Sequence, residues 1–427
     1  MTIPYVAVRG ALPCLTIFLS RCAMNKKQVG AWAMFDFANS VYPAVITTAV
    51  FSAYYSGFVV GGDDGRGTQL WGWAVSASAL IVALTAPLLG AVADRGGARK
   101  KFMLFYTGLC LFGVTMFTTL DAGMALQGFV LFVIANVGFE SAIVFYNSFL
   151  PDIAPREMQG RVSGLGFGVG YAGSALGLLL AVPLVDTIEL VWIMVALFFL
   201  VFSIPTFLYL PKDEPGEMSV PQAMGWGLTN FRSIVAEVWA LKDLRNFLIA
   251  FFFYIDGVLT IIVMAGPVAE ETFAFTPSES IMLFLIVQLS ALAGAFALAK
   301  PTDVWGPKTV LNGVLLLWIM AGVSAFFVQD KSVFFGLAVV AGFGLGSVQS
   351  ASRSYVSLLI PDGRESELFG FYALCGKSSS TVGPILFGTA TVMAGGNQRP
   401  SFLVITMMFV IGLFLLRRVP NPRVLAS

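Results

Sequence analysis

The amino-acid sequence predicts an all-α polytopic membrane protein with twelve transmembrane helices arranged as two halves of six helices. Of its 427 residues, 57% are hydrophobic and only 11% are charged, whereas soluble domains average about 45–50% apolar and about 25% charged residues. The apolar residues gather in runs long enough to cross a bilayer, and loop motifs of the first half recur in the second. The mean hydropathy of +0.84 excludes a soluble globular protein and a disordered one.

The composition also excludes several classes of function. The chain has no histidine, which excludes imidazole metal sites, serine–histidine triads and histidine proton relays. Its four cysteines are scattered and form neither a metal-binding nor a disulfide pattern. The net charge of +1 gives no electrostatic argument for nucleic acid. We therefore expect no metal, no cofactor and no nucleic-acid partner.

The predicted spans follow from the length of the apolar runs, because a helix needs about 20 residues to cross the hydrocarbon core. The residues between the sixth and seventh spans, 211–244, form the longest connection and hold the densest charge. In this linker we expect an amphipathic surface helix around Phe231–Leu241. The spans, with edges good to a few residues, are 29–52, 69–91, 102–120, 123–149, 160–184, 190–210, 245–266, 279–299, 309–328, 333–359, 368–393 and 401–418.

The distribution of lysine and arginine predicts the orientation. With the N-terminus in the cytoplasm, 20 of the 25 basic residues fall on cytoplasmic segments, three on outer loops and two inside spans. We therefore expect both termini to be cytoplasmic, in a bacterial cytoplasmic (inner) membrane. The expected division is a cytoplasmic N-terminal segment (1–28), two six-helix halves (29–210 and 245–418), a cytoplasmic linker (211–244) and a cytoplasmic tail (419–427).

Residues 1–23 precede a second methionine and are interpreted separately. The apolar stretch Ala11–Leu19 is too short to span a membrane and is similar to a weak signal-peptide core. Asn25, Lys26 and Lys27 stand directly before the first span, which is typical of a cytoplasmic beginning. We favour translation from Met24, so that residues 1–23 are not translated.

Short motifs repeat between the two halves. Leu150-Pro151-Asp152 recurs as Ile360-Pro361-Asp362 at an offset of 210 residues. At an offset of 209, the loop from Asp94 to Arg99 falls on the loop from Asp303 to Lys308. A duplicated pair of six-helix halves with a site between them is typical of a secondary transporter.

The first of these loops carries a family resemblance. The segment Gly90–Lys101 resembles the loop between helices 2 and 3 of the major facilitator superfamily, although Ala98 stands where the usual form has a basic residue. The resemblance implies that helices 1, 4, 7 and 10 line a central cavity. It also implies a cytoplasmic gate, for which the candidate residues are Asp94, Arg95, Gly97 and Arg99 with their counterparts Asp303 and Lys308.

Further segments resemble one branch of that superfamily, the bacterial relatives of the fungal autophagy-linked vacuolar amino-acid effluxers. These segments are Trp32–Tyr42, Phe145–Asp152, Ser163–Tyr171 and Tyr254–Gly257. The branch implies a transporter of amino acids or similar small solutes, and it implies no particular substrate for this chain.

Five charged residues, Asp36, Glu140, Asp256, Arg353 and Lys377, lie well inside predicted spans. Inserting a charge there costs at least about 2.5–3.5 kcal/mol, so each of them is expected to have a structural or functional role. Four of the five lie on helices that, by the resemblance, line the cavity. Asparagine or glutamine residues share a helix face with Asp36, Glu140 and Arg353 at helical spacing. The alternative is a set of structural ion pairs that fix helix packing, and Asp36 with Asn39 could be a conformational latch. The candidates for substrate binding or proton coupling are Asp36, Asn39, Asn136, Glu140, Asn147, Asp256, Gln349, Arg353 and Lys377.

The sharpest hypothesis concerns two residues of opposite charge on opposite halves. Glu140 and Arg353 lie at similar depth by span counting, so they could bind the two ends of a zwitterion or pair with each other when the cavity is empty. We predict that Glu140 carries a coupling proton and that Arg353 holds an anionic group of the substrate. Asp94 is predicted to accept hydrogen bonds from a helix N-terminus and so to help close the cytoplasmic gate.

The function predicted overall is secondary active transport of a small solute by alternating access, with protons as the candidate coupling ion, in a monomer embedded in the lipid bilayer. The absence of a GxxxxGK[ST] motif leaves ATP-driven pumping unsupported. The alternatives are a non-transporting sensor or a lipid translocator on the same fold, and an enzyme embedded in the membrane. The missing histidine and nucleophile–base set argue against the enzyme, and the short loops argue against the sensor.

Overall fold

The computed structural model describes residues 24–61, 65–380 and 382–421, and the regular secondary structure of these residues is entirely helical, in agreement with the predicted fold class. The predictions on residues 1–23 and on the end of the C-terminal tail lie outside the described residues. The first half consists of α2 (Lys26–Asn39), η1 (Tyr42–Ala49), α3 (Phe51–Tyr54), η2 (Tyr55–Val60), α4 (Arg66–Arg95), α5 (Arg99–Met116), η3 (Phe117–Thr119), α6 (Ala125–Ser148), α7 (Leu150–Ile153), η4 (Arg156–Met158), α8 (Gln159–Ala181), η5 (Val182–Leu184) and α9 (Ile188–Tyr209).

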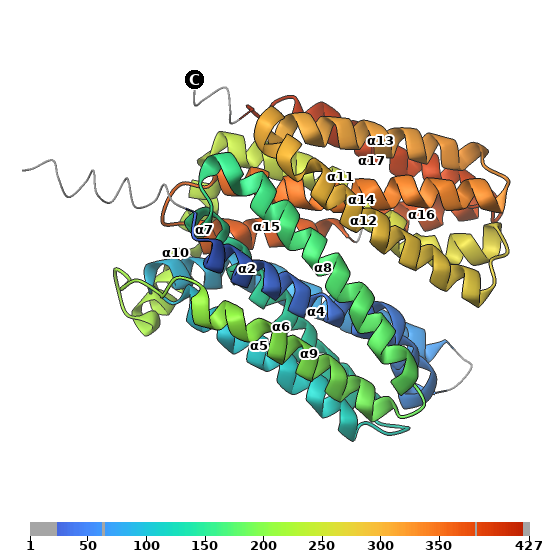
Figure 1. The fold of residues 1–427 in the computed structure, drawn as a ribbon, viewed down its shortest axis with the longest axis horizontal. Helices are drawn as coiled ribbons and strands as arrows, with labels where there is room; N and C mark the ends of the chain where they lie inside the picture. The colour runs from blue at the N-terminus through green and yellow to red at the C-terminus, as the bar shows by residue number, and fades with distance from the viewer. Residues whose placement is uncertain (1–23, 62–64, 381, 422–427) are drawn as a thin grey trace, which may run out of the picture.

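The linker and the second half follow in the same all-helical form. Each half has its own apolar core, and Figure 1 shows the halves as two bundles, with α2 to α9 in one and α11 to α17 in the other. The remaining elements are α10 (Val220–Ala240), α11 (Lys242–Pro267), η6 (Val268–Thr272), α12 (Pro277–Trp305), α13 (Pro307–Phe327), α14 (Lys331–Leu359), α15 (Glu365–Ser379), α16 (Val382–Met393) and α17 (Arg399–Leu416).

Eleven helical segments of the described chain are long and apolar enough to cross a membrane. They match eleven of the twelve predicted spans. The remaining prediction, one span over 368–393, is wrong in detail, because two shorter helices, α15 and α16, occupy this stretch. Pro384 lies in the first turn of α16, where a residue without a backbone N–H is tolerated, whereas it would interrupt the interior of a continuous helix.

The first span is longer and less regular than predicted. It runs from Lys26 to Val60, and its second half contains two π-helical stretches, η1 and η2. Pro43 lies in the first turn of η1. π-Helical turns within α-helices are frequent at functional sites, and η1 begins only six residues after Asp36.

Two helix pairs make the most extensive contacts between the halves. Helix α4 packs along α15, and α8 packs along α12. Glycines allow the close approach of the first pair: a Cβ on Gly370 would lie 2.6 Å from the Ala86 carbonyl oxygen, and a Cβ on Gly90 would overlap the backbone at Ser366. At the second pair, a Cβ on Gly164 would lie 2.7 Å from the Ala295 carbonyl oxygen. We call these two contacts the α4–α15 seam and the α8–α12 seam.

The linker forms the expected amphipathic helix, although α10 begins at Val220 and is longer than predicted. It packs against α4, where the guanidinium of Arg95 lies 3.7 Å from the ring centroid of Trp226. Its opposite face exposes apolar side chains at helical spacing, including Leu228 and Trp239. Such a helix is typical of the membrane–water interface.

Candidate functional site

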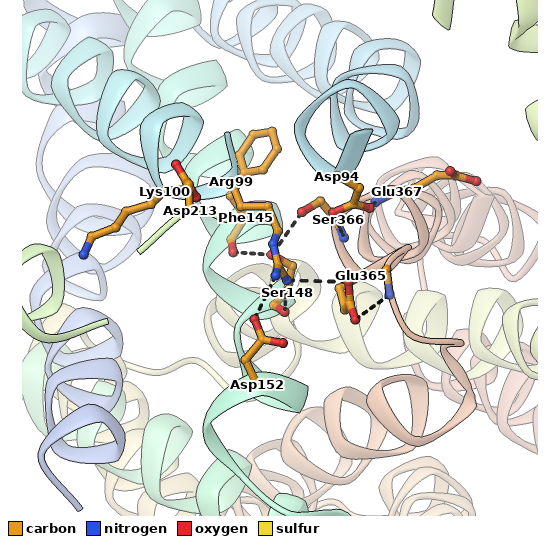
Figure 2. Close-up of polar contacts among 11 residues, drawn as sticks. Asp94, Arg99, Lys100, Phe145, Ser148, Asp152, Asp213, Glu365, Ser366 and Glu367 are labelled. Atoms are coloured by element: carbon orange, nitrogen blue, oxygen red, sulfur yellow. Dashed lines mark hydrogen bonds and ion pairs between the residues drawn. The ribbon is translucent and has the colours of Figure 1, made fainter. Parts of the chain in front are cut away.

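Asp94 ends α4 and caps a helix of the other half (Figure 2). Its two carboxylate oxygens accept the backbone N–H groups of Ser366, at 3.1 Å, and Glu367, at 2.9 Å. These amides belong to the first turn of α15, where the helix has unsatisfied donors and a partial positive charge. The contact fits the predicted gate role of Asp94 and ties the first half to the second.

Arg99 makes a second contact between the halves, next to the Asp94 cap. Its guanidinium donates to the Ser148 carbonyl oxygen at 3.3 Å and pairs with Asp152 at 2.9 Å and with Glu365 at 3.6 Å. Figure 2 shows that these partners come from the end of α6, from α7 and from the start of α15. One planar side chain therefore joins three helices of both halves, as a guanidinium with five donors can.

The second copy of the loop motif repeats the cap. Asp303, in the last turn of α12, accepts the backbone N–H groups of Gly160 at 2.6 Å and Arg161 at 3.1 Å, in the first turn of α8. The side chain of Arg161 also pairs with it at 3.2 Å. The end of the molecule that carries Asp94 and Asp303, which we call the motif end, is thus closed by two related contacts.

The other predicted gate residues, Arg95, Gly97 and Lys308, contact the linker or their own half. Arg95 pairs with Glu217 of the linker at 3.3 Å. Gly97 has a φ of +55°, and a side chain there would meet the linker backbone. Lys308 donates to the carbonyl oxygens of Arg417, at 3.1 Å, and Val419, both in its own half. None of the three touches the opposite half among the contacts described.

Deeper in the molecule, Arg353 of α14 reaches into the first half. Its Nη1 donates to Asp36 at 2.9 Å and to Asn147 at 3.3 Å, while Nε and Nη2 donate to the hydroxyl and carbonyl oxygens of Ser163 at 3.0 and 2.8 Å. The Arg353 and Asp36 side chains are 2% and 11% exposed. This ion pair is therefore a buried contact between the halves.

Aromatic rings enclose the same guanidinium. Its carbon lies 4.0 Å from the ring centroid of Phe167, 4.5 Å from Trp32 and 5.7 Å from Tyr146. A buried cation is favoured both by a carboxylate partner and by ring faces. The arrangement leaves Arg353 with no free face toward a solute in this conformation.

Glu140 does not pair with Arg353, as the sequence hypothesis allowed, but with Lys377. Sequence counting gave the depth of each charge but not its direction around the helix axis, and the rotation of α6 turns Glu140 toward α15. The Glu140 and Lys377 side chains remain 17% and 31% exposed. This pair also joins the halves, and it is the more accessible of the two.

The remaining candidates have separate surroundings. Asn136 donates to Ser78 at 2.7 Å within the first half, and Gln349 accepts the hydroxyl of Tyr171 at 2.7 Å across the halves. The Asn39 side-chain nitrogen is buried without a hydrogen-bond partner. Asp256 accepts the backbone N–H of Gly383 at 3.0 Å, and no described contact joins it to either ion pair.

The polar contacts described between the halves lie between the motif end and the middle of the spans. At the opposite end, the charged contact described lies within one half: Lys331 donates to Glu279 at 2.7 Å. The hydrogen bond from this ammonium group is the main reason why the pKa of Glu279 is lowered to about 2. The described structure is therefore closed at the motif end.

Sequence reasoning missed several residues of these contacts. Asp152 and Ser163 belong to segments that carried the repeat and the resemblance, so the signal was present. Their partners, however, lie on other helices, and the partner of Ser163 is 190 residues away in the sequence. Tyr171 and Phe167 lie in the same glycine-rich segment as Ser163. The aromatic enclosure of Arg353 has no sequence signal, because it depends on how four helices rotate against one another.

Comparisons with known proteins agree with this architecture. A family model described as "Vacuole effluxer Atg22 like" matches residues 72–425. The chain is 30% identical to a protein of Bacillus subtilis (strain 168) described as an uncharacterized MFS-type transporter, YxiO, over 92% of this chain and 95% of that protein. It is 25% identical to autophagy-related protein 22 of Coccidioides immitis (strain RS), over 79% of this chain and 70% of that protein.

Among solved structures, the chain is similar to the human organic anion transporter MFSD10. The TM-score is 0.74 with 16% sequence identity, over 92% of this chain and 99% of that one. At this level of identity the similarity concerns the fold alone.

Proposed function

We propose a function from the premise that this chain is a major facilitator transporter and belongs to the Atg22-like vacuole effluxer family. The proposal is that it exports a small zwitterionic solute, such as an amino acid, by alternating access between its two halves. The family description and the bacterial relative support solute transport, since they are named as an effluxer and a transporter, whereas the outward direction is part of our proposal. The charges between the halves support the zwitterion.

The observation that carries the proposal is the Glu140–Lys377 pair. It places one charge of each sign on opposite halves, and both side chains are partly accessible. A zwitterion carries a carboxylate for Lys377 and an ammonium for Glu140, so it can replace each partner of the pair. Binding would then exchange one contact between the halves for two contacts to the solute.

Arg353 has a different role in this proposal from the one predicted from the sequence. All of its polar contacts are directed at the first half, and its side chain is buried. We therefore assign the substrate carboxylate to Lys377 and regard the Asp36–Arg353 pair as a lock of the conformation that is closed at the motif end. Removing one partner of such a pair leaves an uncompensated buried charge.

Alternating access follows from the two seams. The carboxylate caps of Asp94 and Asp303 hold the motif end closed, so the solute path opens at the other end in this conformation. Export requires the opposite conformation as well, in which both caps are released. With the motif end cytoplasmic, as the lysine and arginine distribution predicts, the solute would load from the cytoplasm after this release.

The test is a ligand screen on the purified full-length protein. A bound solute raises the apparent melting temperature by mass action, about 2.7 kcal/mol of stabilisation at 100 times Kd. We expect stabilisation by at least one amino acid, and loss of it when the same compound is supplied as its amide or as its N-acetyl derivative. Equal stabilisation by these single-charge analogues would contradict the proposal.

Variants of Glu140 and Lys377 test whether the stabilisation measured in the ligand screen depends on this ion pair. Glu140→Gln and Lys377→Gln should each abolish the stabilisation by the amino acid. Glu189→Gln is the matched control, since Glu189 is exposed at the start of α9 and makes no described contact with the other half. If the stabilisation persists in both pair variants, the solute binds elsewhere.

A further inference from the structure

Helix α10 is held by contacts to both halves at the motif end, and Figure 1 shows it at the end of the two bundles where α7 also lies. Toward the first half, a Cβ on Gly227 would lie 2.9 Å from Leu88 Cδ1 of α4. Toward the second half, Glu237 pairs with Arg364, in the loop before α15, at 3.5 Å. These contacts fix the rotation of α10 about its own axis. The buried face of the helix consists of Ala223, Gly227, Ile234 and Val238.

A second face of α10 is apolar but exposed. Leu228, Phe231, Val235 and Trp239 follow one another at intervals of three or four residues and therefore share one side of the helix. Leu228 is 64% exposed and Trp239 is 60% exposed. The described chain thus leaves this row, which we call the α10 stripe, largely uncovered along three turns.

The α10 stripe continues an exposed apolar row on α4. Leu80 and Leu84 of that span are 60% and 62% exposed, and Leu88, one turn further along, meets α10 at Gly227. Residues four apart share a helix face, so the row leads along α4 directly to α10. Because α4 crosses the bilayer, its exposed leucines face the acyl chains, and the stripe lies where this lipid-facing surface ends.

The charges of α10 are sorted with respect to the stripe. Arg232 is three residues from Val235 of the stripe and three from Thr229 of the polar face, so it stands at the border between the two. Its side chain is exposed, and no hydrogen bond or ion pair is described for it. Glu237, the other charged residue of this helix, lies on the side away from the stripe and is paired with Arg364. The charge next to the stripe is therefore positive and unneutralised.

This arrangement matches the boundary between lipid headgroups and acyl chains. An amphipathic helix lies there with its apolar face about 5–10 Å deep, and tryptophan is enriched at the same level. Basic side chains at this height attract anionic lipids. A second cation lies at the end of the stripe, since the guanidinium of Arg245 is 5.9 Å from the ring centroid of Trp239 and donates to the Trp239 carbonyl oxygen at 3.1 Å.

We propose that α10 is a binding surface for anionic phospholipids in the leaflet at the motif end. The α10 stripe packs among the acyl chains, and Arg232 donates to a lipid phosphate. The continuity of the stripe with the exposed row of α4 favours lipid over a soluble protein or a second copy of the chain as its occupant. With the motif end cytoplasmic, as the lysine and arginine distribution predicts, this is the cytoplasmic leaflet. The proposal does not depend on the transported solute.

The test measures the depth of spin labels on α10 in the full-length protein, reconstituted in lipid nanodiscs. Single labels are attached through Val235→Cys on the stripe and Ser233→Cys on the polar face, in a background without the native cysteines. Oxygen collides with labels in the hydrocarbon, and a nickel chelate collides with labels in water. We expect the Val235 label to favour oxygen and the Ser233 label to favour the chelate, and Leu228→Cys provides a repeat of the stripe measurement.

The lipid charge is tested by adding phosphatidylglycerol in steps to phosphatidylcholine. The Val235 label should move deeper as the anionic fraction rises, and Arg232→Gln should need a roughly five-fold higher fraction for the same depth, as the loss of one basic residue predicts. Lys101→Gln is the matched control, because it removes an exposed positive charge at the same end without touching α10.

Three outcomes would overturn the proposal. Chelate access to the Val235 label equal to that of the Ser233 label would show that the stripe faces water. Shielding of the Val235 label from both reagents would show a protein on the stripe, such as a second copy of this chain. Identical titrations for Arg232→Gln and Lys101→Gln would remove the assignment to anionic lipid.

Discussion

The two seams between the halves are built on the same repeated motif, but they differ in what surrounds the motif carboxylate. Asp94 at the α4–α15 seam and Asp303 at the α8–α12 seam both end a helix, and both accept two backbone N–H groups from the first turn of a helix in the opposite half. Each half therefore closes the motif end by capping a helix of the other.

The basic residue five positions after each carboxylate marks the difference. Arg99 crosses to the second half through Glu365, whereas Lys308 turns back to the carbonyl oxygens of its own half. At the α8–α12 seam the added cation is Arg161, whose side chain is 43% exposed. Water screens this pair from the Arg161 side, which weakens it, although Asp303 itself is buried.

This difference indicates which part of the motif carries the gate. The carboxylate cap is present at both seams, whereas the basic residue of the motif itself crosses between the halves only at the α4–α15 seam. We therefore expect the carboxylates to control closure on both sides and the basic residue to matter on one side only.

Asp94→Asn is expected to have the largest effect. It replaces a charged acceptor of two N–H groups, and hydrogen bonds to charged groups are worth about 1.5–3 kcal/mol, so the closed state should lose roughly 10- to 150-fold in population. Spin labels at Lys27 and Pro361, both exposed at the motif end, should report a longer distance by pulsed electron resonance.

Two variants sharpen this comparison. Asp303→Asn should open the α8–α12 seam in the same way, read by labels at Glu157 and Trp305. Asp213→Asn is the matched control, because Asp213 of the linker caps the start of α5 through the amides of Lys100 and Lys101 and makes no contact with the second half among those described. An unchanged Lys27–Pro361 distance in Asp94→Asn would refute the gate.

Arg99→Lys should have an intermediate effect. A single ammonium group cannot hold Ser148, Asp152 and Glu365 in the fixed geometry of the guanidinium. We expect a loss of about 1 kcal/mol, roughly a five-fold shift toward the open state, at the α4–α15 seam alone. An equal increase in the spin-label distance between Glu157 and Trp305 would mean that Arg99 also stabilises the α8–α12 seam, contrary to this prediction.

Lys308→Gln should have the smallest effect. Its partners are carbonyl oxygens at the end of α17 and just beyond it, so its loss should change the unfolding free energy by no more than about 0.5 kcal/mol, as for most surface substitutions. Both label distances should remain those of the wild type. A longer distance at either seam would show that Lys308 takes part in closure.

Much of the fold was predictable because bilayer thickness fixes the length of each span and because the halves repeat. Eleven spans were predicted as single helical segments and are confirmed, and so is the resemblance to the effluxer family. The division of the eleventh span was not predicted, since 368–393 is long enough for one span, although the polar run from Lys377 to Ser380 and Pro384 both indicated an irregularity. The π-helical part of the first span had no clear signal either.

For the site, sequence reasoning identified which charges lie inside the membrane but not how they pair. The sequence hypothesis allowed Glu140 and Arg353 to pair with each other, but Glu140 pairs with Lys377 and Arg353 pairs with Asp36. A span-counting argument fixes height along a helix, whereas pairing depends on rotation about its axis and on the tilt of the opposite half. The carboxylate of Asp94 was predictable, because the motif places it at a helix end beside a loop.

The linker described above also defines where the polypeptide can be divided into two expressible fragments. Residues after Leu210 remain attached to the first half: Asp213 caps α5, the Met218 amide donates to the Arg95 carbonyl oxygen, and Trp226 stacks on Arg95. A break at residue 211 would strip the first fragment of these contacts. A break at Leu241, between α10 and α11, would instead leave all of these contacts within the first fragment.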